Sequence, residues 1–335
     1  MRVLIVGDMR VGTNSRSVAE GYKTAGHDVA WVDISPSTTA AKGSKLWYSV
    51  RKLQRVTAEE DTRVLREVNA ATLEFGPDIL LAIKVIHYDQ SIFLDNRIPI
   101  KVHQSFDDVS NPDNVSAEYL DHEADWDHIV TTKRHNVPEL YARGAKDVLF
   151  IWGAYDPQFR RRTTSLDQRP FDIGFIGASR PDRCTLPRQF ADNAPFKGII
   201  YGPRWHRRYP IGVRGVALKR AATGPAYTVA ANSFKIGLIL LNSENRDQHT
   251  NRTFEAPASG QLVLAQRTVE HLEVFQDGVS GILFDHMGEA WEHVRNLQRN
   301  PVQMRNIAEA GFMMISKGGH TYRDRANQVI KHVSS

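Results

Sequence analysis

The chain has 335 residues, 41% of them hydrophobic and 24% charged, with a mean hydropathy of -0.40 and a formal net charge of +5. This length exceeds what one hydrophobic core usually serves, so two domains are expected, and the composition is that of an ordinary globular protein. The single cysteine, Cys184, excludes an intrachain disulfide and a cysteine-rich zinc site. The apolar run 3–7 is too short for a signal-peptide core, and no segment approaches the ~20 apolar residues that span a bilayer, so a cytoplasmic location is expected.

The first half of the chain reads as an alternation of strands and helices. Residues 2–7 are predicted to form a buried strand, followed by a loop, a helix at 16–25 and a second strand at 28–33. This order is a βαβ unit, which implies a parallel sheet. Further strands are expected at 78–83, 98–102, 128–132 and 147–151, and helices near 58–75, 115–120 and 134–143. Six strands alternating with helices predict a doubly wound α/β domain.

A second alternating series follows residues 153–172, which read as an interdomain linker. Its strands are expected at 173–178, 198–202, 235–242, 261–265 and 281–285, and its helices at 183–192, 269–275, 287–298 and 301–316. The predicted fold class is therefore α/β, with two Rossmann-like, doubly wound parallel-sheet domains facing a cleft. The domains are expected at 1–155 and 156–320, and residues 321–335 as a C-terminal helix packing back toward the N-terminal domain.

Positive charge is concentrated in the second half of the chain. Residues 1–155 hold 18 Lys+Arg and 22 Asp+Glu, whereas 156–335 hold 25 and 16. Within the second half, residues 158–220 alone contain 14 basic and 4 acidic residues. Such a stretch is typical of proteins that bind phosphates, nucleic acid or a membrane surface, and equally of a merely solvated basic face.

Ligands of open α/β sheets bind beyond the carboxyl ends of the strands, so the loops there supply the first candidates. Gly12 lies in GDMRVG, which matches neither the dinucleotide fingerprint nor a P-loop; it either permits a turn or lets the backbone approach a ligand. His103 and Asp107 lie in VHQSFDD, with Asp108 as a competitor, and Lys84 follows the preceding strand. These side chains are candidates for proton transfer or for binding sugar hydroxyls, against the alternative of solvated or capping roles.

Two loops of the second domain combine basic and aromatic residues. FIGASRPDR brings Arg180 and Arg183 to a strand end, where guanidinium groups suit a diphosphate. YGPRWHRRY carries Gly202 and Trp205, which are predicted on the base side, with the tryptophan stacking on a base. The alternative is a loop that packs its own tryptophan.

The stretch DQHTNRTFEAPASG, residues 247–260, follows a buried strand and is expected to open a short helix. A helix start after a buried strand presents unpaired N–H groups suited to a phosphate. Glu255, one turn further on, has the geometry to accept hydrogen bonds from vicinal hydroxyls of a ribose or sugar. Capping of its own helix is the alternative for this carboxylate.

Residues 235–330, from KIGLILLN to the terminal HTYRDRANQVI, resemble the donor-binding domain of group-1 glycosyltransferases of GT-B fold. The order of features carries the resemblance: a buried strand, an acidic turn and helix, small residues with glycine, a second strand, the DGVSGILF turn and a helix with NPVQMR. The likeness is greatest to the bacterial branch that includes spore-maturation-type glycosyltransferases. Similar but weaker signals cover the rest of the chain.

The resemblance implies transfer of a sugar from a nucleotide-sugar donor, with the first domain on the acceptor side. Retaining members carry Glu, seven residues and Glu, which Asp247 and Glu255 match with Asp in the first place. By resemblance, Glu255 holds the ribose, Asp247 is catalytic beside the sugar, and His103 lies near the donor sugar. His249, Thr250 and Asn251 are expected at the phosphates, with Arg180 and Arg183 on the diphosphate, and Arg252 is expected among the donor-binding residues, as is Gly12. Arginines and helix N-termini stabilise the leaving group, so no cofactor and no metal are expected.

Three alternatives stay open at this stage: a sugar-nucleotide epimerase of the same fold, a nucleic-acid-binding protein using 158–220, and a catalytically silent member. Under the leading hypothesis nucleic acid is not expected as a partner, and the acceptor is a glycan, a lipid-linked molecule, a protein or a small molecule. Residues 36–56, with Trp47 and Tyr48, are assigned to acceptor recognition. They form either a patch for peripheral contact with the inner face of a membrane or an ordinary helix with a basic face.

Overall fold

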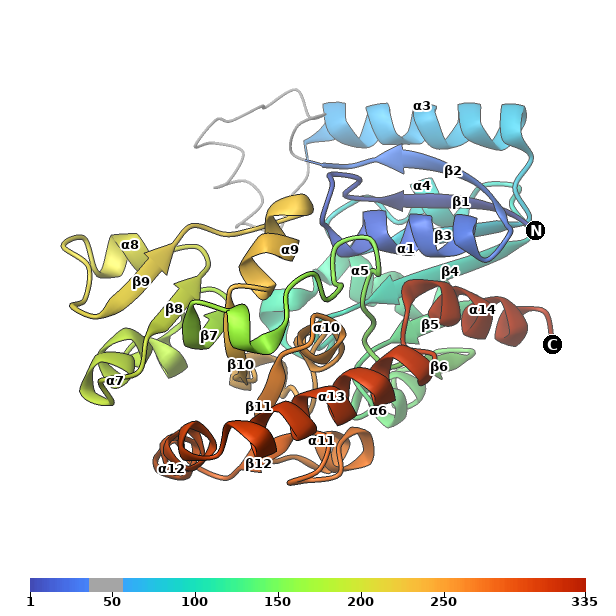
Figure 1. Ribbon diagram of the computed structural model, residues 1–335. Helices are drawn as coiled ribbons and strands as arrows, with labels where there is room; N and C mark the ends of the chain where they lie inside the picture. The colour runs from blue at the N-terminus through green and yellow to red at the C-terminus, as the bar shows by residue number, and fades with distance from the viewer. Residues whose placement is uncertain (36–56) are drawn as a thin grey trace. The chain divides into compact units, whose positions relative to one another are not determined.

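A computed structural model of the protein describes residues 1–35 and 57–335 (Figure 1). Segment 36–56, to which the sequence analysis assigned acceptor recognition, lies outside the described residues. The chain divides into two units: Met1–Trp152 together with Tyr322–Ser335, and Gly153–Thr321. The sequence analysis placed the boundaries close by, at 155/156 and 320/321.

The first unit is built on a six-stranded sheet in the order β2-β1-β3-β4-β5-β6, and all its neighbouring strands are parallel. Its strands are β1 (Arg2–Gly7), β2 (Asp28–Asp33), β3 (Ile79–Ile83), β4 (Ile100–Ser105), β5 (His128–Thr131) and β6 (Val148–Phe150). The strand order reverses between β1 and β3, which is where open α/β sheets usually place a ligand.

Helices of the first unit cover the sheet, and local capping sets their ends. They are α1 (Asn14–Thr24), α3 (Ala58–Phe75), α4 (Ser91–Leu94), α5 (Ala117–His122), α6 (Asn136–Ala142) and α14 (Tyr322–Val333). Helix α3 begins at Thr57, whose hydroxyl accepts from the Glu60 N–H, and ends at Gly76 with φ of 56°. Helix α14 packs against α1 (Figure 1), and a Cβ at Gly21 would lie 2.6 Å from the Tyr322 carbonyl oxygen.

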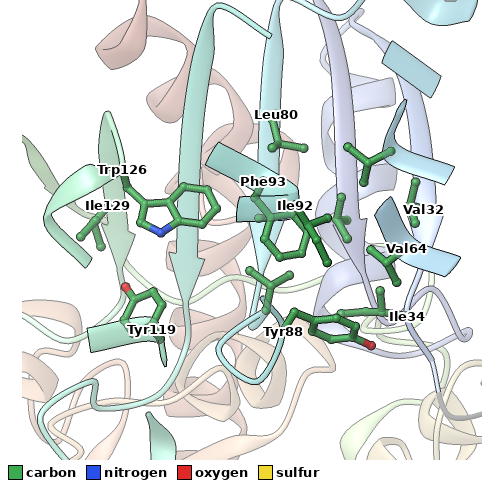
Figure 2. Close-up of a cluster of buried hydrophobic side chains, with 14 of the residues drawn as sticks. Val32, Ile34, Val64, Leu80, Tyr88, Ile92, Phe93, Tyr119, Trp126 and Ile129 are labelled. Carbon is green, nitrogen blue, oxygen red and sulfur yellow. The ribbon is translucent and has the colours of Figure 1, made fainter. Parts of the chain in front are cut away.

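Apolar side chains from the sheet and its helices form one core in this unit (Figure 2). The rings of Phe93 and Trp126 stack with centroids 6.2 Å apart, and Tyr119 lies beside the tryptophan. Val64 reaches this core from α3, toward Val32 of β2. Burying side chains of this size contributes roughly 1.5–3 kcal/mol each, which fixes the helices on the sheet.

The second unit has a six-stranded sheet in the order β12-β11-β10-β7-β8-β9, again with all neighbours parallel. Its strands are β7 (Phe171–Ile176), β8 (Gly198–Tyr201), β9 (Val216–Lys219), β10 (Phe234–Ile239), β11 (Leu262–Gln266) and β12 (Ile282–Phe284). The prediction of two doubly wound parallel sheets is confirmed. Strand β9 was missed because it has four residues, none of them buried, inside a basic loop at the sheet edge.

Seven helices accompany the second sheet among the described residues: α7 (Leu186–Asp192), α8 (Trp205–Arg208), α9 (Pro225–Ala231), α10 (Arg252–Ala258), α11 (Val269–Val274), α12 (Met287–Arg299) and α13 (Pro301–Lys317). Helix α13 packs against α10 and β11, and α12 against β12. Asn300 caps α13 by accepting from the Gln303 N–H, directly before Pro301 at the first helical position. Across the described part of the chain, no helix combines the length and apolarity needed to cross a bilayer.

Candidate functional site

The second sheet reverses its strand order between β7 and β10. Strands β8 and β9 extend to one side of this pair, and β11 and β12 to the other (Figure 1). Ligands of doubly wound sheets bind in the crevice outside the strand ends at such a switch point. The loops that leave β7 and β10 hold most of the residues predicted to bind a donor, so the topology brings them to one edge.

A pocket of about 310 Å³ opens at this edge. Its lining is Asp182, Arg183, Leu186, Gln189, Leu240, Leu241, Ser243, Gln266, Phe284, Asp285, His286 and Met287. These residues come from the carboxyl ends of β11 and β12, from the loops after β7, β10 and β12, and from the starts of α7 and α12. They combine apolar side chains with a few polar groups. That mixture and size are typical of small-molecule sites.

Arg183 lines the pocket, and Arg180 lies in the same loop after β7. Arg183 is fixed in the wall: its two Nη atoms donate to the carbonyl oxygens of Leu240 (3.2 Å) and Leu241 (3.0 Å). Arg180 is more exposed, and its Nη1 donates to Glu244 at 2.6 Å. An ion pair in water is weak, so the Arg180 guanidinium can exchange its carboxylate for another anion.

Glu255 is the centre of a buried ionic cluster. Its side chain is 2% exposed and accepts from Arg160 Nε at 2.9 Å and from the Tyr227 hydroxyl at 3.0 Å. Arg252 Nη1 pairs with its second oxygen, Oε2. The guanidinium of Arg160 lies over the Tyr227 ring, 4.1 Å from the centroid. Arg160 Nη1 is buried without a hydrogen-bond partner among the described residues, so the cluster holds an unsatisfied donor.

Arg252 connects this cluster to the switch point. Its Nε donates to the carbonyl oxygen of Ile176, the last residue of β7, at 3.2 Å. Its side chain is 36% exposed, whereas its partner Glu255 is buried. A guanidinium that is partly exposed at the strand ends, next to a buried carboxylate, is a natural ligand for an entering phosphate.

His249 and Asn251 fasten the loop after β10 to the chain at 153–154. The Gly153 N–H donates to His249 Nε2 at 3.0 Å, which leaves the proton on Nδ1, 2.5 Å from Glu270 Oε2. Asn251 Oδ1 accepts from the Ala154 N–H at 3.3 Å. Because both nitrogens of the buried His249 ring are engaged, its imidazole holds the loop in place, and the expected contact of its backbone amide with a phosphate stays a prediction.

Asp247 and Thr250 brace the same loop. Asp247 Oδ2 accepts from the Asn242 N–H at 3.2 Å, and the Thr250 hydroxyl accepts from the Arg252 N–H at 3.2 Å. Asp247 is half-buried and lies in the turn after β10. Its carboxylate shapes the turn that leads to Arg252, and its place beside the donor sugar stays a prediction.

Trp205 and Gly202 do not form the expected base platform. Trp205 is 0% exposed; its Nε1 donates to the Gly177 carbonyl oxygen at 2.8 Å and its ring packs edge-on against Phe175. A Cβ at Gly202 would lie 1.9 Å from that same oxygen, so the glycine is required by the close approach of two loops. The prediction of a base-stacking role for Trp205 is therefore wrong, because the ring packs inside the domain.

His103, predicted to be catalytic, is a core residue of the first unit. It is 0% exposed, its Nδ1 lies 2.8 Å from the Tyr119 hydroxyl, and its ring packs against those of Tyr119 and Trp126. Burial lowers the pKa of His103 to about 3, so the imidazole is neutral. The prediction is wrong because β4 continues to Ser105, which leaves His103 in mid-strand and not at the strand end.

Asp107 lies where the prediction placed it, just beyond β4. It pairs with Lys84, which follows β3 in a left-handed conformation with φ of 56°, and both side chains are partly exposed. Its competitor Asp108 is buried and accepts from Asn136 Nδ2 at 2.8 Å, so it is structural. Gly12 has φ of 89° in the loop after β1, which supports the turn interpretation.

Sequence reasoning missed two of the three partners of Glu255 and most of the pocket. Arg160 stands in the run RRR of the expected linker, and Tyr227 in a helix that was not predicted. Among the described residues, the candidate metal-binding group is His128, Asp147 and His332, in the first unit. This group belongs to the first unit, whereas the pocket belongs to the second. The spacing of the three residues in the sequence did not indicate a metal site.

Fold and site together define a two-domain α/β protein with a ligand site at the switch point of its second sheet. Residues 183–331, a little less than half of the chain, match the model of a family described as glycosyl transferase-like. The matched range includes residues 235–330, on which the resemblance rests. No curated protein sequence matches the chain.

Solved structures of similar fold include sucrose-phosphate synthase from Thermosynechococcus elongatus, with 12% identity, a TM-score of 0.70, and coverage of 100% of this chain and 98% of that one. An α-glucosyltransferase in complex with UDP and a 13-mer DNA containing an HMU base has 15% identity, a TM-score of 0.70 and 99% coverage of both chains. HepE of Anabaena in complex with UDP-glucose has 13% identity, a TM-score of 0.67, and coverage of 100% and 99%. These likenesses confirm the predicted GT-B fold.

Proposed function

We propose that the protein transfers a sugar from a nucleotide-sugar donor to an acceptor, with the donor bound by the second unit. One observation carries the proposal: the pocket and the arginines at the switch point lie within or beside the segment that matches a glycosyl transferase-like family. The neighbours that were solved with UDP or UDP-glucose favour a UDP-sugar as the donor. Within this class we assign the chain to the spore-maturation-type branch, on the resemblance of residues 235–330.

The nucleoside is placed in the 310 Å³ pocket, where Leu240 and Met287 offer apolar contacts and Gln266 a polar one. The diphosphate is placed on Arg180 and Arg252, whose guanidinium groups are partly exposed. Arginine matches phosphate oxygens bidentately, and its charge persists at all relevant pH values. In this arrangement each of the two arginines exchanges its present carboxylate partner for a phosphate: Arg180 leaves Glu244, and Arg252 leaves Glu255.

Binding at Arg252 has a consequence for Glu255. When Arg252 turns to a phosphate, Glu255 Oε1 keeps its bond to Arg160, and Oε2 keeps the Tyr227 hydroxyl. Oε2 then has a lone pair free to accept from a ribose hydroxyl. The ionic cluster thereby becomes the ribose site that the resemblance implied, with Arg252 exchanging one anion for another.

The chemistry follows from the charge that develops on the departing diphosphate. The guanidinium groups at the strand ends stabilise that charge, so the transfer does not require a metal ion. Asp247 lies on the sugar side of this site, and retention of anomeric configuration follows from the match of Asp247 and Glu255 to the retaining pattern. In the first unit, the partly exposed pair of Asp107 and Lys84 is assigned to acceptor binding in place of His103.

The direct test is donor turnover. The full chain is incubated with UDP-, GDP-, ADP- and dTDP-sugars, with and without pools of glycans, lipid extracts and peptides, and released nucleoside diphosphate is measured. A glycosyltransferase releases it from one donor and only when an acceptor is added, and NMR of the product then shows whether the anomeric configuration is retained. An altered sugar nucleotide without acceptor identifies an epimerase instead, and indifference to every donor contradicts the proposal.

The basic segment 158–220 supports nucleic-acid binding as a second candidate function. Exposed arginines, among them Arg204, Arg207 and Arg214, lie around β9, and the α-glucosyltransferase of similar fold was solved with DNA. Binding through such residues weakens steeply with salt, because it releases counterions. Fluorescence polarisation with labelled DNA and RNA at two salt concentrations separates the two functions: the glycosyltransferase proposal expects no tight binding near physiological salt.

A further inference from the structure

Three potential metal ligands meet at one place in the first unit. His128 is the first residue of β5, Asp147 directly precedes β6, and His332 lies in the last turn of α14. The cluster therefore lies at the amino ends of β5 and β6, whereas Lys84 and Asp107 lie beyond the carboxyl ends of β3 and β4. It takes no part in the donor site, which the second unit carries.

The geometry of this cluster is tight. His128 Nδ1 lies 2.6 Å from Asp147 Oδ2, and His332 Nε2 lies 2.5 Å from the same oxygen. One atom from each of the three residues falls within 4.8 Å of the others. The side chains of His128, Asp147 and His332 are 21%, 33% and 31% exposed, so an ion reaches them from solvent.

We propose that His128 Nδ1, the Asp147 carboxylate and His332 Nε2 together bind one divalent transition-metal ion of the zinc type. Two imidazoles and a carboxylate suit Zn²⁺ and its neighbours, whereas Mg²⁺ and Ca²⁺ prefer sites made of oxygen atoms. Solvent supplies the fourth ligand, because the three side chains are partly exposed.

The distances from the two histidine nitrogens to Asp147 Oδ2 are those of hydrogen bonds. A bound ion takes the place of the protons in these hydrogen bonds. Ligand atoms around a tetrahedral Zn²⁺ lie about 3.3 Å apart, given metal–ligand bonds of about 2.0–2.1 Å. The nitrogens therefore move outward from the carboxylate by less than about 1 Å, which the last turn of a terminal helix accommodates. Binding deprotonates the ligand atoms, so it weakens as the pH falls.

The ion would fasten the far end of α14 to the sheet. The start of this helix is already held, because Tyr322 donates to Asn14 Oδ1 at 3.2 Å and Arg325 Nε donates to the Trp152 carbonyl oxygen at 3.0 Å. His332 is the corresponding contact in the last turn. A ligand that binds only the folded state raises its stability with concentration, so the metal acts as a structural clamp for the first unit.

The test uses the full chain without a polyhistidine tag, after treatment with a chelator. Isothermal titration calorimetry with ZnCl₂ is expected to show one equivalent bound, and titration with MgCl₂ none. His128→Gln and His332→Gln should each weaken Zn²⁺ binding by about tenfold or more, as losses at metal sites do. The matched control is His122→Gln: His122 lies 3.0 Å from Asp125 in the same unit but lacks a second histidine, so its loss should leave the affinity unchanged.

A spectroscopic measurement on the unmodified chain guards against variants that fail to fold. Electron spin-echo spectra of the Cu²⁺-loaded protein should show imidazole nitrogens from two histidines. Absence of one-equivalent binding by the wild type, a Cu²⁺ spectrum without two imidazoles, or wild-type affinity in folded His332→Gln would each overturn the proposal. None of these outcomes depends on whether the protein transfers a sugar.

Discussion

Removal of the Glu255 carboxylate should destabilise the second unit strongly. Glu255→Ala leaves Arg160 buried without its carboxylate and the Tyr227 hydroxyl without its acceptor. Breaking a buried ion pair by deleting one partner costs about 3–5 kcal/mol, because an uncompensated charge stays buried. Tyr227→Phe removes one hydrogen bond to a charged group, so it should cost less, about 1.5–3 kcal/mol.

Urea unfolding, followed by circular dichroism, measures these differences. The matched control is Glu244→Ala: Glu244 also pairs with an arginine, Arg180, but its side chain is 55% exposed, so the expected loss is below about 1 kcal/mol. The double variant Arg160→Met with Glu255→Met should be more stable than Glu255→Ala, because it removes both charges. A loss below about 1 kcal/mol for Glu255→Ala, or a double variant no more stable than Glu255→Ala, would refute the reasoning.

Three further predictions address the residues whose expected roles changed. Burial lowers the pKa of His103 from 6.5 to about 3 in the folded chain. Between these pH values the unfolded chain binds a proton at this histidine and the folded chain does not. The free energy of unfolding is therefore highest above pH 6.5 and decreases as the pH falls toward 3. Between about pH 7 and 5 the wild type should lose about 2 kcal/mol more than His103→Gln in denaturant titrations, and parallel pH curves would contradict the burial. Trp205→Phe should lower stability by about 1–3 kcal/mol by orphaning the Gly177 carbonyl, yet leave donor affinity unchanged in calorimetry; a selective loss of affinity would restore the stacking role. Gly202→Ala should reduce the soluble folded yield, because its Cβ meets the Gly177 oxygen at 1.9 Å, and a wild-type melting curve would disprove that contact.

The architecture was largely predictable because it rests on local patterns. Apolar runs bounded by turn residues located eleven of the strands, and their alternation with helices dictated parallel sheets. Strand β9 escaped because Val216–Lys219 is too short and too exposed to show a period. The strand end at residue 102 was placed too early, and that small error turned His103 from a core residue into a catalytic candidate.

The site was less predictable because its chemistry depends on partners distant in sequence. The position of Glu255 after a buried strand could be predicted from the sequence. Its partner Arg160 could not, because it lies 95 residues away and no local pattern connects the two. The burial of Trp205 likewise depends on Gly177 and Phe175, which another strand supplies. Residue type and spacing thus indicated where polar groups gather, and the tertiary contacts decided which of them stay available to a ligand.

The most direct test of the donor site is calorimetric titration of sugar nucleotides into a variant whose pocket is filled. Ser243 is exposed at the pocket rim, so Ser243→Trp blocks the space without disturbing the core. Ser165→Trp is the matched control, since Ser165 is an exposed serine that lines a different pocket of the same unit. We predict that the wild type and Ser165→Trp bind one sugar nucleotide with equal affinity and that Ser243→Trp does not. Equal binding by all three proteins, or none by the wild type, would contradict the assignment of this pocket to the donor.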